Sequence, residues 1–478
     1  MIGSTAGGQT HVAIDWGYFQ AEGRQTRLEV YLGFNRSSLD YLSEGEHFVA
    51  RPAVVVMIKR RGTIIAFREL EMADRRPQAT GYIAQQADFT LKPGSYDLLV
   101  VAEDRSGPLV DTTLAIEVPR LRRRGIRISS LQPSYLVRKD ATGRQFTKQG
   151  LLVVPNAAVV YDREHPLLWY YTEIYGITPG DSLVVETFIA LDESPVYIPD
   201  VRRIAAANLS FIEWGAVNLA GFTPGDYNLS CKAAVGDETV VSKVDFHVAE
   251  PDTTDIGQQS GVDLARGIAA VRPQFNLARY EAADSTTQVR WLARAAARLA
   301  KTVKQDSANY LGELQSSWPL AKRYDPGWNT TGRLSELGRV MLLYGLPAGI
   351  QVYPATNSTT EYQVWDYSSL DSGRVVVFSY SAARAEYILA HGTLPGTPFN
   401  AGWQDRLPAR FAAVEAPSEQ ATADSTATDS TAVEPLELGP EPEIPEPAPL
   451  AQPADTTEAP AEQAATDSTA TDSTAVEP

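Results

Sequence analysis

The first part of the chain alternates apolar and polar residues with a period of two. Residues 27–34 follow this pattern, and Arg60-Arg61-Gly62 connects the apolar run 54–59 to the apolar run 63–67. A period of two is typical of strands buried on one face, and a short connection with glycine is typical of a hairpin. The pattern over residues 11–118 therefore predicts an all-β domain.

A Pro-Gly turn followed by a tyrosine occurs twice, 131 residues apart. Gly94 precedes Tyr96 by the same spacing as Gly225 precedes Tyr227, and a further strand-like run closes each segment. A repeat of this length predicts two immunoglobulin-like β-sandwiches in tandem. The tyrosines occupy the place of the corner tyrosine of such sandwiches, whose hydroxyl binds a nearby backbone group. Two ordinary core tyrosines after turns are the alternative.

These patterns predict a mainly β chain with a short helical part and a small α+β module. The predicted segments are a disordered N-terminus (1–10), a first immunoglobulin-like sandwich (11–119), a linker (120–147), a second sandwich (148–250), a second linker (251–283), a helical segment (284–322), the α+β module (323–410) and a disordered acidic tail (411–478).

Two basic stretches have a functional and a structural interpretation. The arginine cluster at 120–127 has the composition of a site for phosphate or an anionic glycan, but a solvated linker is favoured. Residues 284–304 predict a helix that starts at Asp284 and has arginine and lysine on its polar faces. Such a helix can lie on a membrane surface. Its apolar stripe is narrow and rich in alanine, which favours packing within the protein.

The module at 323–410 leaves one element open between helix and strand. Residues 334–344 place apolar side chains on one helical face, with Gly345 as a C-terminal cap and Pro347 just beyond it, while 340–344 also fits a buried strand. We favour the helix. Residues 363–367, 374–379 and 386–389 predict successive antiparallel strands.

The location of the charges excludes some classes of function. The 15 acidic residues after position 410, where no lysine or arginine occurs, account for all but two units of the net charge of −17. The near-neutral remainder does not predict a nucleic-acid surface.

No run is long enough to predict a transmembrane segment, and residues 1–8 lack the apolar core of a signal peptide. They do resemble the small residues that follow one, so we expect an exported protein whose leader is not visible.

At the module the chain resembles the GWxTD-domain proteins, a family of exported bacterial proteins without an assigned activity. Gly327-Trp328-Asn329-Thr330 matches the motif that names the family, with Thr331 at its last position. Gly338-Arg339 and Tyr344-Gly345-Leu346-Pro347 then follow, and Trp365-Asp366-Tyr367 is the later Trp-x-Tyr. Residues 148–156 and 171–175 are similar to that family's linker and second β-domain. The resemblance implies location in the periplasm or cell envelope.

The candidate site residues lie in this module and are aromatic or basic rather than catalytic. We predict that they build the module's core and one partly exposed binding face: Trp328, Arg339, Tyr344, Trp365 and Tyr367. We assign structural roles to Gly327, Gly345, Pro347, Tyr96 and Tyr227. If Trp365 anchors the fold, it should lie over 334–344 and point away from Val364.

No pattern in the sequence predicts chemistry. The five histidines are scattered without metal-ligand spacing, and Cys231 is the only cysteine, so we predict no metal, no cofactor and no catalytic residue. We expect a non-enzymatic scaffold or binding protein that presents its C-terminal module to an envelope protein or polymer. The alternative is an envelope hydrolase that uses carboxylates of the module, namely Glu336, Glu361 and Asp366. The sequence does not define the oligomeric state.

Overall fold

The computed structural model describes most of the chain as far as Trp403. The described residues are 2–6, 9–45, 47–76, 82–121, 124–140, 143, 145–162, 165–192, 194–197, 201–250, 261–355, 360–370, 373–400 and 402–403. All of them belong to one compact unit, residues 1–417. The predicted disordered tail (411–478) lies outside the described residues.

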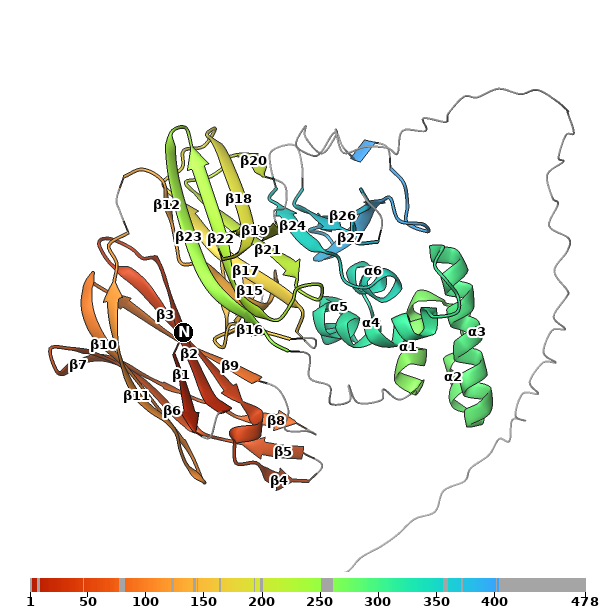
Figure 1. Cartoon of the computed structure of the whole chain (residues 1–478), viewed down its shortest axis with the longest axis horizontal. Coiled ribbons are helices and arrows are strands. Elements are labelled where there is room, and N and C mark those ends of the chain that lie inside the picture. Colours follow the sequence, from red (N-terminus) through yellow and green to blue (C-terminus); the bar gives the residue numbers. More distant parts are fainter. Residues whose placement is uncertain are drawn as a thin grey trace, which may run out of the picture. The chain divides into compact units, whose positions relative to one another are not determined.

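The first sandwich consists of two four-stranded sheets, with strand orders β1-β2-β3-β9 and β11-β10-β6-β7, and a small third sheet, β4-β5-β8 (Figure 1). Its elements are β1 (Ile2–Ala6), β2 (Gln9–Gln20), β3 (Thr26–Asn35), η1 (Arg36–Ser38), β4 (Leu42–Glu44), β5 (His47–Ala50), β6 (Ala53–Arg60), β7 (Thr63–Leu70), β8 (Asp74–Arg76), β9 (Tyr82–Leu91), β10 (Gly94–Asp104) and β11 (Gly107–Val118). Alternate residues face inward, and Val30, Val56 and Leu98 are fully buried in one core cluster. The predicted all-β domain is confirmed.

The N-terminus differs from the sequence-based expectation of disorder. Residues Ile2–Ala6 form β1, which pairs antiparallel with β2. The stretch is built from small residues and has no apolar alternation. Its strand conformation therefore depends on backbone pairing with β2, which a side-chain pattern does not reveal.

The hairpin between β6 and β7 forms as predicted. Arg61 and Gly62 connect the strands with φ values of 50° and 80°. Two central residues with positive φ are the mark of a type I′ turn, the turn that matches the twist of a two-residue hairpin. Arg60 and Arg61 consequently lie at the tip, where both are exposed.

The second sandwich pairs a sheet containing β17 and β21 with a six-stranded sheet of order β16-β23-β22-β18-β19, to which β20 adds beside β18. Its strands are β12 (Arg127–Ile128), β13 (Gln132–Lys139), β14 (Thr147–Lys148), β15 (Leu151–Pro155), β16 (Val160–Tyr161), β17 (Leu167–Tyr175), β18 (Ser182–Leu191), β19 (Ser194–Tyr197), β20 (Arg202–Ala205), β21 (Ser210–Asn218), β22 (Gly225–Val235) and β23 (Glu238–Val248). Residues 120–147, expected to be a linker, carry β12, β13 and the start of β14. The sequence missed them because β12 and β14 have two residues each and are specified by pairing.

The two sandwiches repeat the same corner. Tyr96 donates its hydroxyl hydrogen bond to the carbonyl of Lys92 at 2.8 Å, and Tyr227 donates to the carbonyl of Thr223 at 2.9 Å. In each case the acceptor lies four residues upstream, and the preceding glycine has a positive φ, 144° at Gly94. Both rings are buried. The predicted pair of corner tyrosines is confirmed, and with it the tandem immunoglobulin-like fold.

The described residues between the second sandwich and β24 form six helices: α1 (Gly261–Val271), α2 (Leu277–Glu281), α3 (Ser285–Val303), α4 (Tyr310–Tyr324), α5 (Pro326–Thr331) and α6 (Glu336–Tyr344). The expected linker at 251–283 thus contains α1 and α2, and its residues 251–260 lie outside the described part. Asp284 caps α3 by accepting a hydrogen bond from the backbone N–H of Thr287. The alternative left open at 340–344 is resolved as the helix α6.

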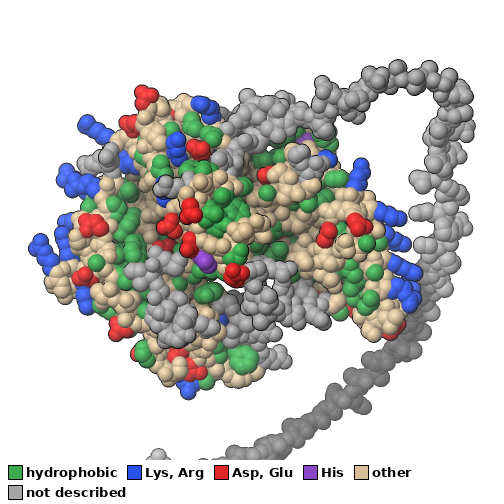
Figure 2. All heavy atoms as spheres, in the orientation of Figure 1, with side chains coloured by type: hydrophobic (Ala, Val, Ile, Leu, Met, Phe, Trp, Pro, Cys, Tyr) green, Lys and Arg blue, Asp and Glu red, His purple; other side chains and the backbone are tan. Residues whose placement is uncertain are grey.

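The longest helix, α3, packs by its alanine-rich stripe as we favoured. Leu292, Ala296, Leu299 and Val303 are buried, whereas Val289 is 65% exposed near the start of the helix. The opposite side carries a row of exposed cations, which Figure 2 shows as blue side chains along the outer edge of this helix. No helix of the described part is long and apolar enough to span a membrane.

The last four strands continue a sheet of the second sandwich. β24 (Gly349–Tyr353), β25 (Tyr362–Asp366), β26 (Val375–Ser381) and β27 (Glu386–Gly392) follow one another in antiparallel order. Gly215, Ala216 and Val217 of β21 pair with residues of β24. The outcome is a ten-stranded sheet of order β14-β15-β13-β17-β21-β24-β25-β26-β27, with β12 beside β17.

Strand β17 is buried on both faces because two cores meet at it. Leu168 and Tyr170 point into the core between the two sheets, whereas Trp169 and Tyr171 point into a core shared with α1, α3, α4 and α6. All nine of its residues are buried. This double burial explains the unbroken apolar run from Leu167, which has no period of two.

Candidate protein-binding surface

The aromatic residues predicted for the module's binding face lie mainly in its core. Trp365 and Tyr367 are 1% and 0% exposed, and Trp365 packs against Phe378 with ring centroids 4.7 Å apart. Trp365 shares a core cluster with residues of α6, while Val364 belongs to a cluster on the other face of β25. The packing account predicted this arrangement.

The other predicted residues of the module hold backbone segments together. Arg339 donates hydrogen bonds to the carbonyl of Ala270, in the last turn of α1. Tyr344 donates to the carbonyl of Pro395, and Tyr367 donates to that of Gly345. Trp328 is partly buried, and its ring meets that of Trp318 edge to face at 4.9 Å. A binding role for any of them stays a prediction, and their contacts favour packing.

Asp325 explains the glycines of the motif. Its carboxylate is fully buried and accepts hydrogen bonds from the backbone N–H groups of Trp328, at 3.0 Å, and Ser335, at 2.9 Å. A Cβ at Gly338 would lie 2.6 Å from the carboxyl carbon of Asp325, and one at Gly327 would lie 2.8 Å from Ser335 N. Both positions therefore need glycine so that α5 and α6 can approach the carboxylate. This role of Asp325 was not predicted, because the residue precedes the motif.

The two remaining structural positions lie where α6 ends. Gly345 has φ 77° and donates its backbone N–H to the carbonyl of Met341, which ends the helix as predicted. Pro347 follows before β24 begins at Gly349.

The carboxylates of the hydrolase alternative are engaged in structural contacts. Glu336 accepts a hydrogen bond from the backbone N–H of Leu389, so it links α6 to β27. Glu361 pairs with Lys139 of β13 at 2.7 Å and accepts from Tyr387. Asp366 accepts from the backbone N–H of Ser368 at 2.8 Å. Within the described residues, no group of three or more His, Cys, Asp or Glu side chains is placed to hold a metal ion.

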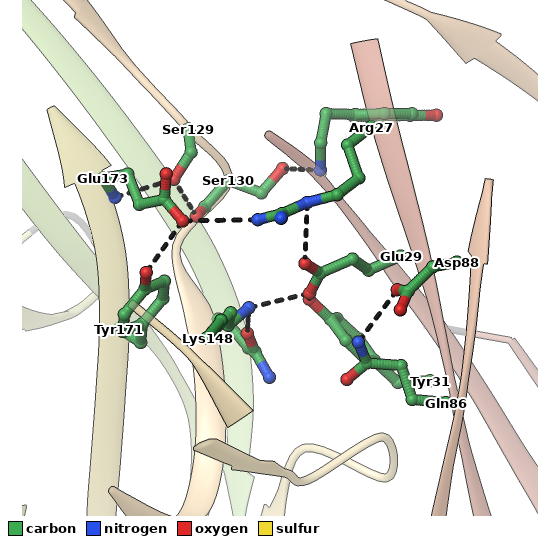
Figure 3. A network of polar contacts seen from close by, with 12 residues as sticks. Arg27, Glu29, Tyr31, Gln86, Asp88, Ser129, Ser130, Lys148, Tyr171 and Glu173 are labelled. Atoms are coloured by element: carbon green, nitrogen blue, oxygen red, sulfur yellow. Dashed lines mark hydrogen bonds and ion pairs between the residues drawn. The ribbon is translucent and has the colours of Figure 1, made fainter. Parts of the chain in front are cut away.

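A buried network of charges joins the two sandwiches (Figure 3). Lys148 of β14 lies 2.7 Å from Glu29 of β3, and their side chains are 8% and 2% exposed. Arg27 binds Glu29 at 3.1 Å and reaches Glu173 of β17 at 3.3 Å. Tyr171 donates to Glu173 at 2.7 Å. Each carboxylate is thus shared between the sandwiches.

Aromatic rings surround the buried lysine of this network. The Lys148 ammonium lies 4.0 Å from the ring centre of Phe19 and 4.5 Å from that of Tyr171, and it also bonds the side-chain oxygen of Gln132. Burial lowers the pKa of Lys148, and the neighbouring Glu29 opposes that effect. A buried cation that is paired and capped by rings from both sandwiches fixes their docking. We therefore interpret this network as a rigid joint.

One sheet face of the first sandwich is apolar on its outer side. Val55 and Met57 of β6 alternate with inward-facing core residues and so point outward, and they pair directly with Val101 and Leu99 of β10. Phe67 of β7, which pairs with Met57, extends the patch and is 55% exposed. None of the five belongs to a core cluster of the described part. We call these five residues the outer face.

The second sandwich has polar or charged residues at three of the four corresponding positions that the structure describes, whereas Met57 corresponds to the apolar Phe188. Its strand pairing matches residue for residue at a distance of 131: Val101 opposite Val55 becomes Lys232 opposite Glu186. The latter two form an ion pair at 3.7 Å. Leu99 is replaced by Ser230 in the same way. At Val55, Leu99 and Val101 the first sandwich thus has apolar side chains where the second sandwich has Glu186, Ser230 and Lys232.

The sequence carried a signal for the outer face that we did not use. Residues 98–101 are Leu-Leu-Val-Val, whereas their counterparts 229–232 are Leu-Ser-Cys-Lys. A solvated antiparallel strand alternates apolar and polar residues, so an unbroken apolar run in a strand with one solvent-facing side indicates an interaction surface.

Comparison with known proteins does not assign a family. No family model matches the chain, and no curated protein matches it. Among the matching solved structures is an ectodomain fragment of ICAM-5 comprising domains D1–D4, with 9% identity over 49% of this chain and 69% of that one. The TM-score of that match is 0.16, so no argument is drawn from it. The tandem immunoglobulin-like fold is established by the strands and corner tyrosines described above.

Proposed function

We propose that this chain is a non-enzymatic scaffold of the bacterial envelope that binds a partner protein through the outer face of its first sandwich. The main support is the difference between the two sandwiches. Val55 and Val101 of the first sandwich occupy the positions at which the second has the ion pair of Glu186 and Lys232. Phe67 is exposed and Val55, Met57 and Val101 are half-buried. Apolar surface at these positions contacts water unless another surface covers it, which is unfavourable.

The buried joint supports a scaffold rather than two loosely linked domains. Because Glu29 pairs with Lys148 and Arg27 pairs with Glu173 across the joint, the first sandwich is held in one orientation on the second. A rigid mount lowers the entropy cost of binding, since the partner meets a preorganised surface. The proposed binding surface thus moves from the C-terminal module, where Trp365 and Tyr367 are buried, to the first sandwich.

Export and membership of the GWxTD-domain proteins remain part of the proposal. They are supported by the motif residues Gly327 and Trp328. The buried Asp325 also leaves no room for a Cβ at Gly338, so the local structure around the motif requires glycine at this position. The extracellular location of many tandem β-sandwiches agrees with export but does not require it.

Site-specific photocrosslinking in the native cell tests the binding surface. A photoreactive residue at Met57 should give an adduct of defined mass with one partner protein. The matched control places the same residue at Phe188, the corresponding position of the second sandwich, where we expect no such adduct. Equal crosslinking at both positions, or none at Met57, would refute the proposed surface.

A further inference from the structure

The edge of one sheet in the first sandwich is formed by a strand with unusual exposure. β7 ends the sheet of order β11-β10-β6-β7, and no other strand of the described residues pairs with its free side. Ile64, Ile65 and Phe67 of this strand are 50%, 48% and 55% exposed. A long apolar edge strand is a template for pairing with another chain, and most proteins shorten, charge or cover such an edge.

The second sandwich protects its corresponding edge. The strand that matches β6 is β18, and its outer side pairs with two short strands, β19 and β20, of four residues each. The unprotected edge is therefore a property of the first sandwich and not of the fold.

The charges along β7 are arranged so that the strand complements itself. Its start follows the exposed Arg60 and Arg61 at the hairpin tip, and its end leads through Glu69 to Glu71, which are also exposed. If two copies of β7 pair antiparallel about a two-fold axis, the basic start of each lies beside the acidic end of the other. Parallel pairing would place like charges together.

The charges exclude two registers, and the aromatic ring of Phe67 favours a third. With the axis at Phe67, Arg68 is opposite the partner's Ala66 and Glu69 is opposite the partner's Ile65. An axis at Arg68 or at Glu69 would instead place two like charges directly opposite each other, which is destabilising. The register at Phe67 also pairs the two most exposed rings of the edge, and aromatic cross-strand pairs are favourable.

We propose that a second copy of this chain binds at β7, antiparallel and about a two-fold axis at Phe67. Two four-stranded sheets then join into one sheet of eight strands. The contact is isologous, so it closes as a dimer in which each copy covers the β7 edge of the other. This inference goes beyond the proposed function, because the edge of β7, including Phe67, receives the second copy while Val55, Met57, Leu99 and Val101 of the outer face stay open to a different protein.

The mass of the full chain in solution tests the dimer. The monomer has a mass of 52.1 kDa, and we expect sedimentation equilibrium to give twice that value at micromolar concentrations. The double variant Ile65→Lys/Phe67→Lys should be monomeric, since lysine on an edge strand opposes pairing. Both side chains are exposed, so circular dichroism should show an unchanged fold.

A matched control and a trapping experiment complete the test. Val241→Lys changes a side chain that is 45% exposed on β23, an outer strand of the second sandwich, and it should leave the dimer intact. Phe67→Cys should give a disulfide-linked dimer under oxidation, because Cys231 is buried and does not compete. A monomeric wild type, or a dimer that survives the double lysine variant, would overturn the proposal, while the crosslinking at Met57 stands or falls independently.

Discussion

Removing one charge from the joint between the sandwiches should destabilise the whole protein. Glu29→Gln removes the carboxylate that lies 2.7 Å from Lys148 and 3.1 Å from Arg27. Arg27 keeps Glu173 at 3.3 Å, but the Lys148 ammonium stays buried among Phe19, Tyr171 and the Gln132 amide. Leaving a buried charge without its partner costs about 3–5 kcal/mol.

Lys148→Met should cost less than Glu29→Gln. Glu29 then still binds Arg27 and accepts from the Tyr31 hydroxyl at 2.8 Å. The loss is one hydrogen bond to a charged group, about 1.5–3 kcal/mol. In the double variant neither charge is left unpaired, so its cost should fall below the sum of the single costs by at least about 1.5 kcal/mol.

Urea unfolding followed by tryptophan fluorescence and circular dichroism measures these differences. In the wild type we expect both sandwiches to unfold in one transition, because they share the buried network. In Glu29→Gln the transition should separate into two, with a lower first midpoint. If the losses in unfolding free energy of the two single variants add up to within about 0.5 kcal/mol of the loss in the double variant, the coupling is refuted. An unchanged unfolding free energy in Glu29→Gln would refute the assignment of a rigid joint.

Three further outcomes follow from the described contacts. Trp365→Ala should cost about 3–5 kcal/mol in urea unfolding, since it empties a fully buried site beside Phe378; an unchanged midpoint would favour the binding role instead. Replacing a helical glycine by alanine normally stabilises the helix by about 1 kcal/mol. Gly338→Ala should instead destabilise the module by about 1–3 kcal/mol, because the new Cβ meets Asp325. A raised melting temperature would contradict this. Burial raises the pKa of Tyr344 to about 12, so the folded state binds the hydroxyl proton more tightly than the unfolded state does. The contribution of this proton to the free energy of unfolding is complete below pH 10 and is lost as the pH rises through 12. Tyr344→Phe should therefore flatten the fall in unfolding free energy over that interval, and an identical pH profile would show that this tyrosine is not the cause.

The local features of the fold were predictable because they depend on neighbours in sequence. Two apolar runs joined by a short connection with glycine identified the hairpin of β6 and β7, and the Pro-Gly-x-Tyr repeat identified the corners at Tyr96 and Tyr227. The cap at Asp284 and the end of α6 at Gly345 were likewise visible. Each of these is specified by a few consecutive residues, so the pattern and its cause coincide.

The features that were missed depend on residues distant in the chain. β24 has five residues and no distinctive pattern, and its place is set by pairing with β21, whose Gly215 lies opposite Gln351. The joint of Glu29 with Lys148 brings together residues 119 positions apart. The role of Asp325 appears only when α5 and α6 are packed. For the site, sequence alone led to the aromatic module, since composition does not separate a buried Trp365 from an exposed one.

The pairing of β21 with β24 has a consequence for how the chain is made. When the second sandwich has left the ribosome, its sheet ends at β21 with an uncovered edge, and the strand that completes it lies more than a hundred residues further on. Until α1–α6 emerge, one side of β17 lacks part of its apolar cover, since the core that contains Trp169 and Tyr171 includes residues of α1, α3, α4 and α6. Such a nascent intermediate exposes both a strand edge and a row of aromatics, which are the features that holding chaperones bind and that aggregation exploits. Productive folding therefore requires that α1–α6 and β24 are synthesised and pack before another chain pairs with that edge.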